Sequence, residues 1–181
     1  MERRFSVAIL TVSDRCARGE TRDTAGPALV DVIRRLRNAD VVATACVPDE
    51  REAIAAQLRA WCQVGPCPDL ILTTGGTGLA PRDVTPEATL AVLERRHTGL
   101  VELMRLRRYP QNPRAFLSRA EAGTIGQTLI INLPGSRRGS TECLTALLDV
   151  LPHALETLRG EARHDDERAD ADEPGASDRP A

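Results

Sequence analysis

Short apolar runs alternate along this chain with segments whose apolar residues recur three or four positions apart. The runs at Phe5 to Val12, Val41 to Val47, Leu70 to Thr74 and Thr128 to Asn132 have the length and residue types of buried strands. Strands that alternate with helices are typical of a parallel sheet, because a parallel crossover needs a covering helix. The pattern therefore predicts an α/β fold: an open, mostly parallel sheet flanked by helices in three α/β/α layers.

The segments between the strands predict the helices. Apolar residues at helical spacing mark one helix around Leu29 to Leu36 and another around Ile54 to Trp61. Further helices are expected at about Pro86 to Arg95, Leu100 to Arg108, Leu144 to Leu148 and Pro152 to Arg159. The proline-rich stretch that leads to Ala122 predicts an irregular connection.

The stretch Leu70 to Glu87, LILTTGGTGLAPRDVTPE, carries the clearest chemical signal. An apolar strand runs into three glycines, which let the backbone approach a ligand closely, and Thr85 and Pro86 are expected as N-cap and first residue of a helix. Amides at such a turn attract phosphate, although a tight connection without a ligand explains a lone GGTG equally well. Asp83 favours a ligand, because a carboxylate beside a phosphate loop indicates a divalent cation such as Mg²⁺.

Polar residues also follow the other predicted strands. Ser13 and Asp14 follow the first strand, Asp49 the second, and the segment Asn132 to Ser136 ends the fourth. Ligands of open α/β sheets bind outside the carboxyl ends of the strands, so we expect one phosphate-handling pocket there. Each cluster also has a structural interpretation, because Asp49 and Ser136 can cap helices and Asp14 can order a turn.

Composition excludes several classes of function. All 24 basic residues are arginine, so the chain has no lysine for a P-loop NTPase or for Schiff-base chemistry. GGTG also lacks the GxGxxG spacing of a dinucleotide-binding fold. Aromatic residues make up 2% of the chain, which is too few stacking side chains to indicate a nucleic-acid partner.

Charge and apolar content predict one domain over residues 1–159 and an acidic disordered tail over residues 160–181. The tail carries eight acidic and three arginine residues, which leaves a mildly cationic domain that tolerates anionic ligands. No apolar run approaches the roughly 20 residues that cross a bilayer, and the N-terminus enters the first strand without a cleavage site. Five cysteines without CxxC spacing indicate reduced thiols, and we therefore expect a cytoplasmic protein without a membrane partner.

In its motifs the chain resembles the molybdopterin adenylyltransferases, the Mog-type enzymes of bacteria and the G domain of gephyrin. The resemblance covers nearly all of residues 5–159. It is carried by LTVSD at 10–14, VPDE at 47–50, LILTTGGTGLAPRDVTPEAT at 70–89, TLIINLPGSRRGSTEC at 128–143 and LPHALETLR at 151–159. These blocks, in this order and spacing, are far more specific than GGTG alone.

The resemblance implies adenylyl transfer in molybdenum cofactor biosynthesis, with ATP as co-substrate and Mg²⁺ as cofactor. The terminal phosphate of molybdopterin would attack the α-phosphate of ATP, and pyrophosphate would leave. Asp49 and Asp83 match the functional acidic positions of the family and are the expected catalytic residues and Mg²⁺ ligands. The expected nucleotide and pterin contacts are Ser13, Asp14, Thr73, Thr74, Gly75, Gly76, Thr77, Gly78, Glu87, Pro134, Gly135 and Ser136.

Two rival functions stay open: a non-catalytic pterin-binding scaffold module, which needs the pocket but not the carboxylates, and a hydrolase of nucleotide-linked substrates. The family also implies a homotrimer and a downstream molybdenum insertase as partner. The apolar helices around Leu100 to Met104 and Leu144 to Leu155 are the expected subunit surface. A solvated face, rather than a pocket rim, is expected for Arg107, Arg108, Arg114 and Arg119.

Overall fold

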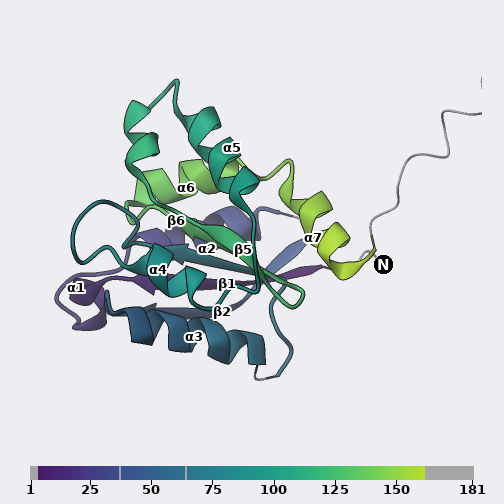
Figure 1. Cartoon of the computed structure of the whole chain (residues 1–181), viewed down its shortest axis with the longest axis horizontal. Coiled ribbons are helices and arrows are strands. Elements are labelled where there is room, and N and C mark those ends of the chain that lie inside the picture. Colours follow the sequence, from purple (N-terminus) through teal and green to yellow (C-terminus); the bar gives the residue numbers. More distant parts are fainter. Residues whose placement is uncertain (1–3, 37, 64, 162–181) are drawn as a thin grey trace, which may run out of the picture.

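The computed structural model describes residues 4–161 except 37 and 64, and its centre is a six-stranded sheet (Figure 1). In spatial order the strands are β2 (Ala39–Val47), β1 (Phe5–Val12), β3 (Leu70–Thr74), β6 (Thr128–Leu133), β5 (Ala122–Ile125) and β4 (Arg95–Arg96). The first four pair in parallel, whereas β5 and β4 pair antiparallel to their neighbours. The predicted mostly parallel α/β sheet is confirmed.

Helices cover both faces of this sheet, as Figure 1 shows. One face packs against α2 (Ala25–Arg34), α5 (Thr98–Arg108), α6 (Arg137–Thr145) and α7 (Leu151–Arg159), and the other packs against α3 (Arg51–Gln63) and α4 (Thr85–Leu90). Each face of the sheet forms a hydrophobic core with its helices, and the core beneath α2, α5, α6 and α7 is the larger. Side chains alternate across β1, so Val7 and Ile9 belong to the larger core and Ala8 and Leu10 to the other. Burial of both faces explains why the central strands are continuous apolar runs.

Four short elements were not predicted. These are α1 (Asp14–Ala17), the hairpin partners β4 and β5, and the 3-10 helix η1 (Pro113–Leu117) within the proline-rich stretch. The helix expected over 86–95 ends at Leu90, because the chain must leave it to pair with β5: the Glu94 amide donates to the Thr124 carbonyl at 2.9 Å. The expectation of an N-cap at Thr85 was wrong, since Val84 occupies that position without a side-chain bond.

The apolar helices expected to form a subunit surface are already covered within the chain. Met104 of α5 and Leu144 of α6 are buried in the larger core, as are Leu151 and Leu155 of α7. That expectation was therefore wrong, and the number of subunits stays a prediction.

The other sequence-based expectations concern the chain ends and the membrane. The predicted tail falls outside the described residues from 162 onward, so the boundary after Arg159 also stays a prediction. Within the described part of the chain, no helix combines the length and the apolar character needed to cross a bilayer.

Candidate active site

The loop between β3 and α4 turns sharply at two glycines. Gly75 and Gly76 have φ values of 112° and 61°, which favour glycine, and a Cβ atom placed on Gly75 would lie 2.1 Å from the Val12 carbonyl oxygen. Thr85 fixes the turn from α4, because its hydroxyl donates to the Gly75 carbonyl at 2.9 Å and its amide donates to the Gly76 carbonyl at 3.0 Å. The threonine that was expected to cap α4 therefore holds the glycine loop in place.

The loop after β6 lies directly against the glycine loop. The Thr74 hydroxyl donates to the Pro134 carbonyl at 2.7 Å, and a Cβ atom placed on Gly135 would lie 3.0 Å from the Gly75 Cα. Ser136 then caps α6, since its hydroxyl accepts from the Gly139 amide at 3.1 Å. The structure thus brings together the two glycine-containing segments that the sequence placed at one edge of the sheet.

The two predicted catalytic carboxylates flank the glycine loop. A Cβ atom placed on Gly76 would lie 3.1 Å from Asp49 Oδ1, and one placed on Gly78 would lie 2.8 Å from Asp83 Oδ2. Gly76 and Gly78 are two residues apart, so their Cα atoms are at most about 7 Å apart. Asp83 Oδ2 also accepts from the Ala80 amide at 2.8 Å, which folds the segment after the glycines back toward the loop.

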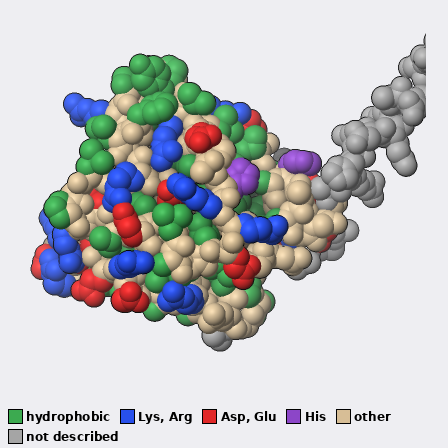
Figure 2. Space-filling model, in the orientation of Figure 1, with side chains coloured by type: hydrophobic (Ala, Val, Ile, Leu, Met, Phe, Trp, Pro, Cys, Tyr) green, Lys and Arg blue, Asp and Glu red, His purple; other side chains and the backbone are tan. Residues whose placement is uncertain are grey.

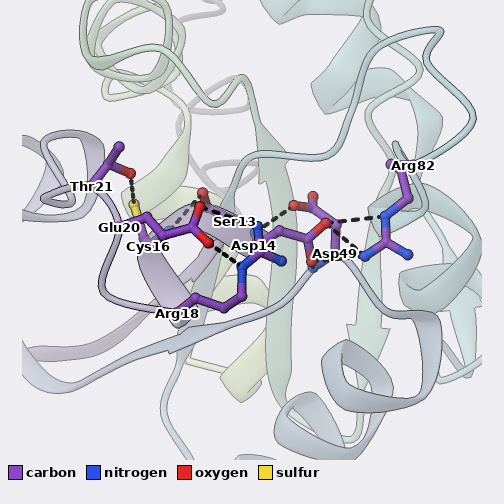
Figure 3. A network of polar contacts seen from close by, with 8 residues as sticks. All are labelled: Ser13, Asp14, Cys16, Arg18, Glu20, Thr21, Asp49 and Arg82. Atoms are coloured by element: carbon purple, nitrogen blue, oxygen red, sulfur yellow. Dashed lines mark hydrogen bonds and ion pairs between the residues drawn. The ribbon is translucent and has the colours of Figure 1, made fainter.

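Asp49 belongs to a polar network that joins the ends of β1 and β2 (Figure 3). Asp49 Oδ2 accepts from the Asp14 amide at 2.7 Å, and Asp14 Oδ1 accepts from the Asp49 amide at 3.1 Å. Arg82 reaches this pair from the segment after the glycines and donates to both oxygens of Asp14, at 2.6 and 2.7 Å. Among the described residues, the Asp49 side chain makes no cap bond to α3, so the capping interpretation of Asp49 was wrong.

The two acids of this network differ in their ionisation. The hydrogen bond from Arg82 lowers the pKa of Asp14. Burial raises the pKa of Asp49, and the negative charges of Asp14 and Asp83 add to that rise. Asp49 is therefore the carboxylate that gains most from a cation placed beside it.

The residues present fit the Mg²⁺ that the sequence suggested. Asp49 Oδ1 accepts no hydrogen bond within the described part of the chain and faces Gly76 of the glycine loop. Asp83 lies beside Gly78 of the same loop. No cluster of three or more candidate metal-binding side chains was found among the described residues. Two carboxylates completed by substrate phosphates are the usual protein contribution to a Mg²⁺ site.

Arg119, for which the sequence predicted a solvated face, instead holds the glycine loop. It bonds to the carbonyls of Gly78 and Asp83, the former at 2.7 Å, and pairs with the Glu87 carboxylate. This bond lowers the pKa of Glu87. The Arg119 amide also donates to the Thr77 carbonyl at 2.8 Å, so one residue holds the glycine loop from both its backbone and its side chain. No spacing in the sequence signals a contact across 41 residues.

A pocket of about 420 Å³, a size typical of ligand sites, opens beside the glycine loop. One wall carries the half-buried ion pair between Arg108 and Glu142, and Arg114 also lines the pocket. The solvated face expected for the arginines in place of a pocket rim was therefore wrong at Arg108 and Arg114, as it was at Arg119. The pocket is lined by Gly76, Thr77, Gly78, Asp83, Arg108, Asn112, Arg114, Ala115, Leu117, Ser118, Pro134, Gly135, Ser136, Gly139, Glu142 and Cys143.

Apolar side chains gather beside the pocket. Figure 2 shows them over the end of α5, where Leu106, Tyr109, Phe116 and Leu117 are exposed and the rings of Tyr109 and Phe116 meet edge to face. Leu117 also lines the pocket, so this apolar tip forms part of its rim.

A larger groove, of about 660 Å³, lies along α2 and β2. Its lining includes none of the predicted site residues, and its acid Asp23 is bonded to Thr11 and to the first amides of α2. We place the candidate site at the smaller pocket because the glycine loop and Asp83 line it and Asp49 faces that loop.

Some predicted contacts have structural partners instead of facing the pocket. Thr73 is fully buried and its hydroxyl accepts from the Asn132 side-chain amide at 2.9 Å, and the Thr74 hydroxyl donates to the Pro134 carbonyl. Ser13 caps the short helix α1, and Glu87 is paired with Arg119. For Thr73 and Thr74 only the backbone stays a candidate ligand contact.

Known proteins are similar to this chain over most of its length. A family described as a probable molybdopterin binding domain matches residues 8–153. The molybdopterin adenylyltransferase of Helicobacter pylori is 39% identical over 155 residues, which are 85% of this chain and 88% of that protein. The Drosophila melanogaster molybdenum cofactor synthesis protein cinnamon is 42% identical over 155 residues, but the chain spans only 26% of its length.

Solved structures of related proteins are similar to this chain as well. The molybdopterin biosynthesis enzyme MoaB from Thermus thermophilus superposes with a TM-score of 0.81 at 52% identity, covering 86% of this chain and 97% of that one. The matched region contains the glycine loop, both flanking carboxylates and the loop after β6. The chain therefore belongs to the molybdopterin-binding domain family of molybdenum cofactor biosynthesis proteins.

Proposed function

We propose that this protein is a molybdopterin adenylyltransferase that uses ATP in molybdenum cofactor biosynthesis. The observation that carries the proposal is the placement of Asp49 and Asp83 beside Gly76 and Gly78 of one glycine loop, which together with Asp83 lines a pocket large enough for a ligand. The Helicobacter pylori relative named for this activity covers nearly the same length of chain. Our proposal includes the cytoplasmic location, the homotrimer and the downstream insertase expected from the sequence.

In the proposed reaction, a terminal phosphate oxygen of molybdopterin forms a bond to the α-phosphorus of ATP. The bond from that phosphorus to the oxygen bridging to the β-phosphate breaks, and pyrophosphate leaves with the electron pair. The attacking phosphate is already an anion, so the protein needs no strong base and acts by positioning and by neutralising charge.

The chain's own residues have distinct tasks in this reaction. The amides from Gly76 to Gly78 hold phosphate oxygens, and Arg119 keeps their loop in one shape by bonding to the loop carbonyls. Ser136 lines the pocket from the loop that contacts the glycines and is our proposed pterin contact. Bound Mg²⁺, held by Asp49 and Asp83, would supply positive charge to the triphosphate.

The variant Asp83→Asn tests whether the protein is an adenylyltransferase or a non-catalytic pterin-binding scaffold. Asp83→Asn keeps the shape of the side chain and a hydrogen-bond acceptor for the Ala80 amide but removes the charge. We expect ATP-dependent adenylylation to fall by at least about a hundredfold, while molybdopterin binding measured by fluorescence stays within a few-fold of the wild-type value. Unchanged turnover would exclude the catalytic role and favour the scaffold.

Three further measurements complete the test. Asp49→Ser removes a carboxylate that would hold Mg²⁺, so we expect it to lose activity as Asp83→Asn does, whereas a residue that merely capped a helix would tolerate serine. Isothermal titration of ATP with and without Mg²⁺ should show binding that depends on the cation. Release of AMP from ATP without molybdopterin would instead favour the hydrolase.

A further inference from the structure

Arg82 is the cation bound to the acidic pair beside the glycine loop. Its guanidinium donates to Asp14 Oδ1 at 2.7 Å and to Asp14 Oδ2 at 2.6 Å from Nη2 and 3.1 Å from Nε. The Arg82 side chain is 61% exposed and that of Asp14 is 22% exposed, so the guanidinium covers the carboxylate from the solvent side. Figure 3 shows Arg82 approaching Asp14 and Asp49 from the side opposite α1.

The same pair includes the carboxylate that would bind the cation of the proposed site. Asp14 and Asp49 are joined by reciprocal bonds between side chain and backbone, so they are held as one unit. Asp49 Oδ1 is directed at Gly76, whereas Arg82 lies on Asp14. Arg82 also precedes Asp83, the second carboxylate at the loop, which places a fixed positive charge close to both acids.

Electrostatics makes Arg82 a competitor of a free divalent cation. A guanidinium about 5 Å from a doubly charged ion, near the surface in water and salt, weakens binding of that ion by roughly tenfold. A triphosphate reverses the sign of this effect, because its negative charge attracts both the metal ion and the arginine, whose planar guanidinium matches phosphate oxygens.

We propose that Arg82, bound to Asp14, prevents a free divalent cation from binding at the Asp14–Asp49 pair, so that the metal ion binds at this site only together with the nucleotide. This inference rests on the proposed function and adds an order of binding to it. Arg82 acts here as a positioning residue that works through Asp14.

Manganese binding tests the proposal directly, since free Mn²⁺ has an electron paramagnetic resonance signal that is lost on binding. We expect Arg82→Gln to bind Mn²⁺ alone about tenfold more tightly than the wild-type protein and to bind ATP with Mn²⁺ several-fold more weakly. A merely structural salt bridge would not shift these two affinities in opposite directions.

Arg18→Gln is the matched control. The Arg18 side chain is exposed, pairs with Glu20 in the same network and makes no bond to Asp14 or Asp49 among the described residues; the Arg18 backbone amide donates to the Asp14 carbonyl, a bond that glutamine keeps. Its loss changes the net charge equally, and we expect less than about a threefold change in either affinity. In an Asp14→Asn background, Arg82→Gln should alter the affinity for Mn²⁺ alone by less than about threefold, because the arginine has lost its anchor.

Three outcomes would overturn the proposal. These are an Arg82→Gln protein that binds Mn²⁺ alone no better than the wild-type protein, an equal gain in Arg18→Gln, and unchanged binding of ATP with Mn²⁺ in Arg82→Gln. If the wild-type protein binds ATP with Mn²⁺ but Arg82→Gln gains no affinity for Mn²⁺, the ordering fails and the proposed function stands. If the wild-type protein does not bind ATP with Mn²⁺, both fail.

Discussion

Replacing Arg119 by glutamine should loosen the glycine loop and weaken nucleotide binding together. The guanidinium bonds to the Gly78 carbonyl, to the Asp83 carbonyl and to the Glu87 carboxylate, and so it links both ends of the segment between the glycines and α4. Glutamine is too short to reach all three partners and carries no charge. The variant therefore leaves two carbonyls of the loop without their protein donor.

The size of the effect follows from these bonds. A charged donor to a carbonyl contributes about 1.5–3 kcal/mol when it is shielded, and an exposed ion pair contributes at most about 1 kcal/mol. The Arg119 side chain is 37% exposed, so water replaces part of what is lost. We expect a loss of about 2 kcal/mol in the free energy of unfolding, which for a domain of this size lowers the melting temperature by roughly 4–8 °C.

Scanning calorimetry and isothermal titration with ATP measure the two consequences of Arg119→Gln. The matched control is Arg107→Gln, because Arg107 is also 37% exposed and bonds to one carbonyl and one carboxylate, those of Ala146 and Asp149, and none of these three residues lines the pocket. Arg107→Gln should lower stability less and leave ATP affinity unchanged. Glu87→Gln, which removes only the charge pair, should cost about 0.5 kcal/mol.

The reasoning fails if Arg119→Gln melts at the wild-type temperature. It also fails if that variant loses stability but binds ATP as tightly as the wild-type protein, since the loop would then keep its shape without the arginine.

The remaining predictions concern stability. Burial alone would raise the pKa of Asp69, but its bonds with Arg159 and a serine outweigh burial and lower the pKa below the ordinary value of 3.8. The ionised Asp69 therefore stabilises the folded state above pH 3.8, and this stabilisation is lost as the pH falls further. Asp69→Asn should cost about 2–3 kcal/mol at pH 7, and urea unfolding should show the difference shrinking below pH 3.8; a constant difference would contradict the assignment. Gly75→Ala should cost more than about 3 kcal/mol, because its Cβ would overlap a carbonyl of β1, whereas Gly126→Ala, with φ 53° and open space, should cost about 1 kcal/mol; equal losses would refute this account.

The sequence predicted the parts of the fold that depend on local patterns. The four parallel strands and the major helices follow from apolar runs and helical spacing, and β3 has the predicted limits, Leu70–Thr74. The hairpin of β4 and β5 was missed because β4 contains only two exposed arginines, Arg95 and Arg96, whose strand character comes entirely from pairing with β5.

The candidate site was predictable where the chemistry lies within a short motif. The glycine loop, Asp49 and Asp83 meet as expected from the rule that ligands bind at the carboxyl ends of parallel strands. Arg119 and Thr85 were misread because their roles depend on partners that are fixed only by tertiary structure. A local rule assigns a threonine before proline to a helix cap, but here Thr85 donates to the Gly75 carbonyl.

Direct contact between the loops after β3 and β6 has a consequence for how two substrates would share this protein. The Thr74 hydroxyl holds the Pro134 carbonyl, and Gly135 lies so close to Gly75 that no side chain fits between them. A displacement of either loop is therefore transmitted to the other without an intermediate. A pterin that shifts the loop after β6 would therefore change the affinity of the protein for nucleotide. Thermodynamic linkage requires that the nucleotide change the affinity for the pterin by the same factor.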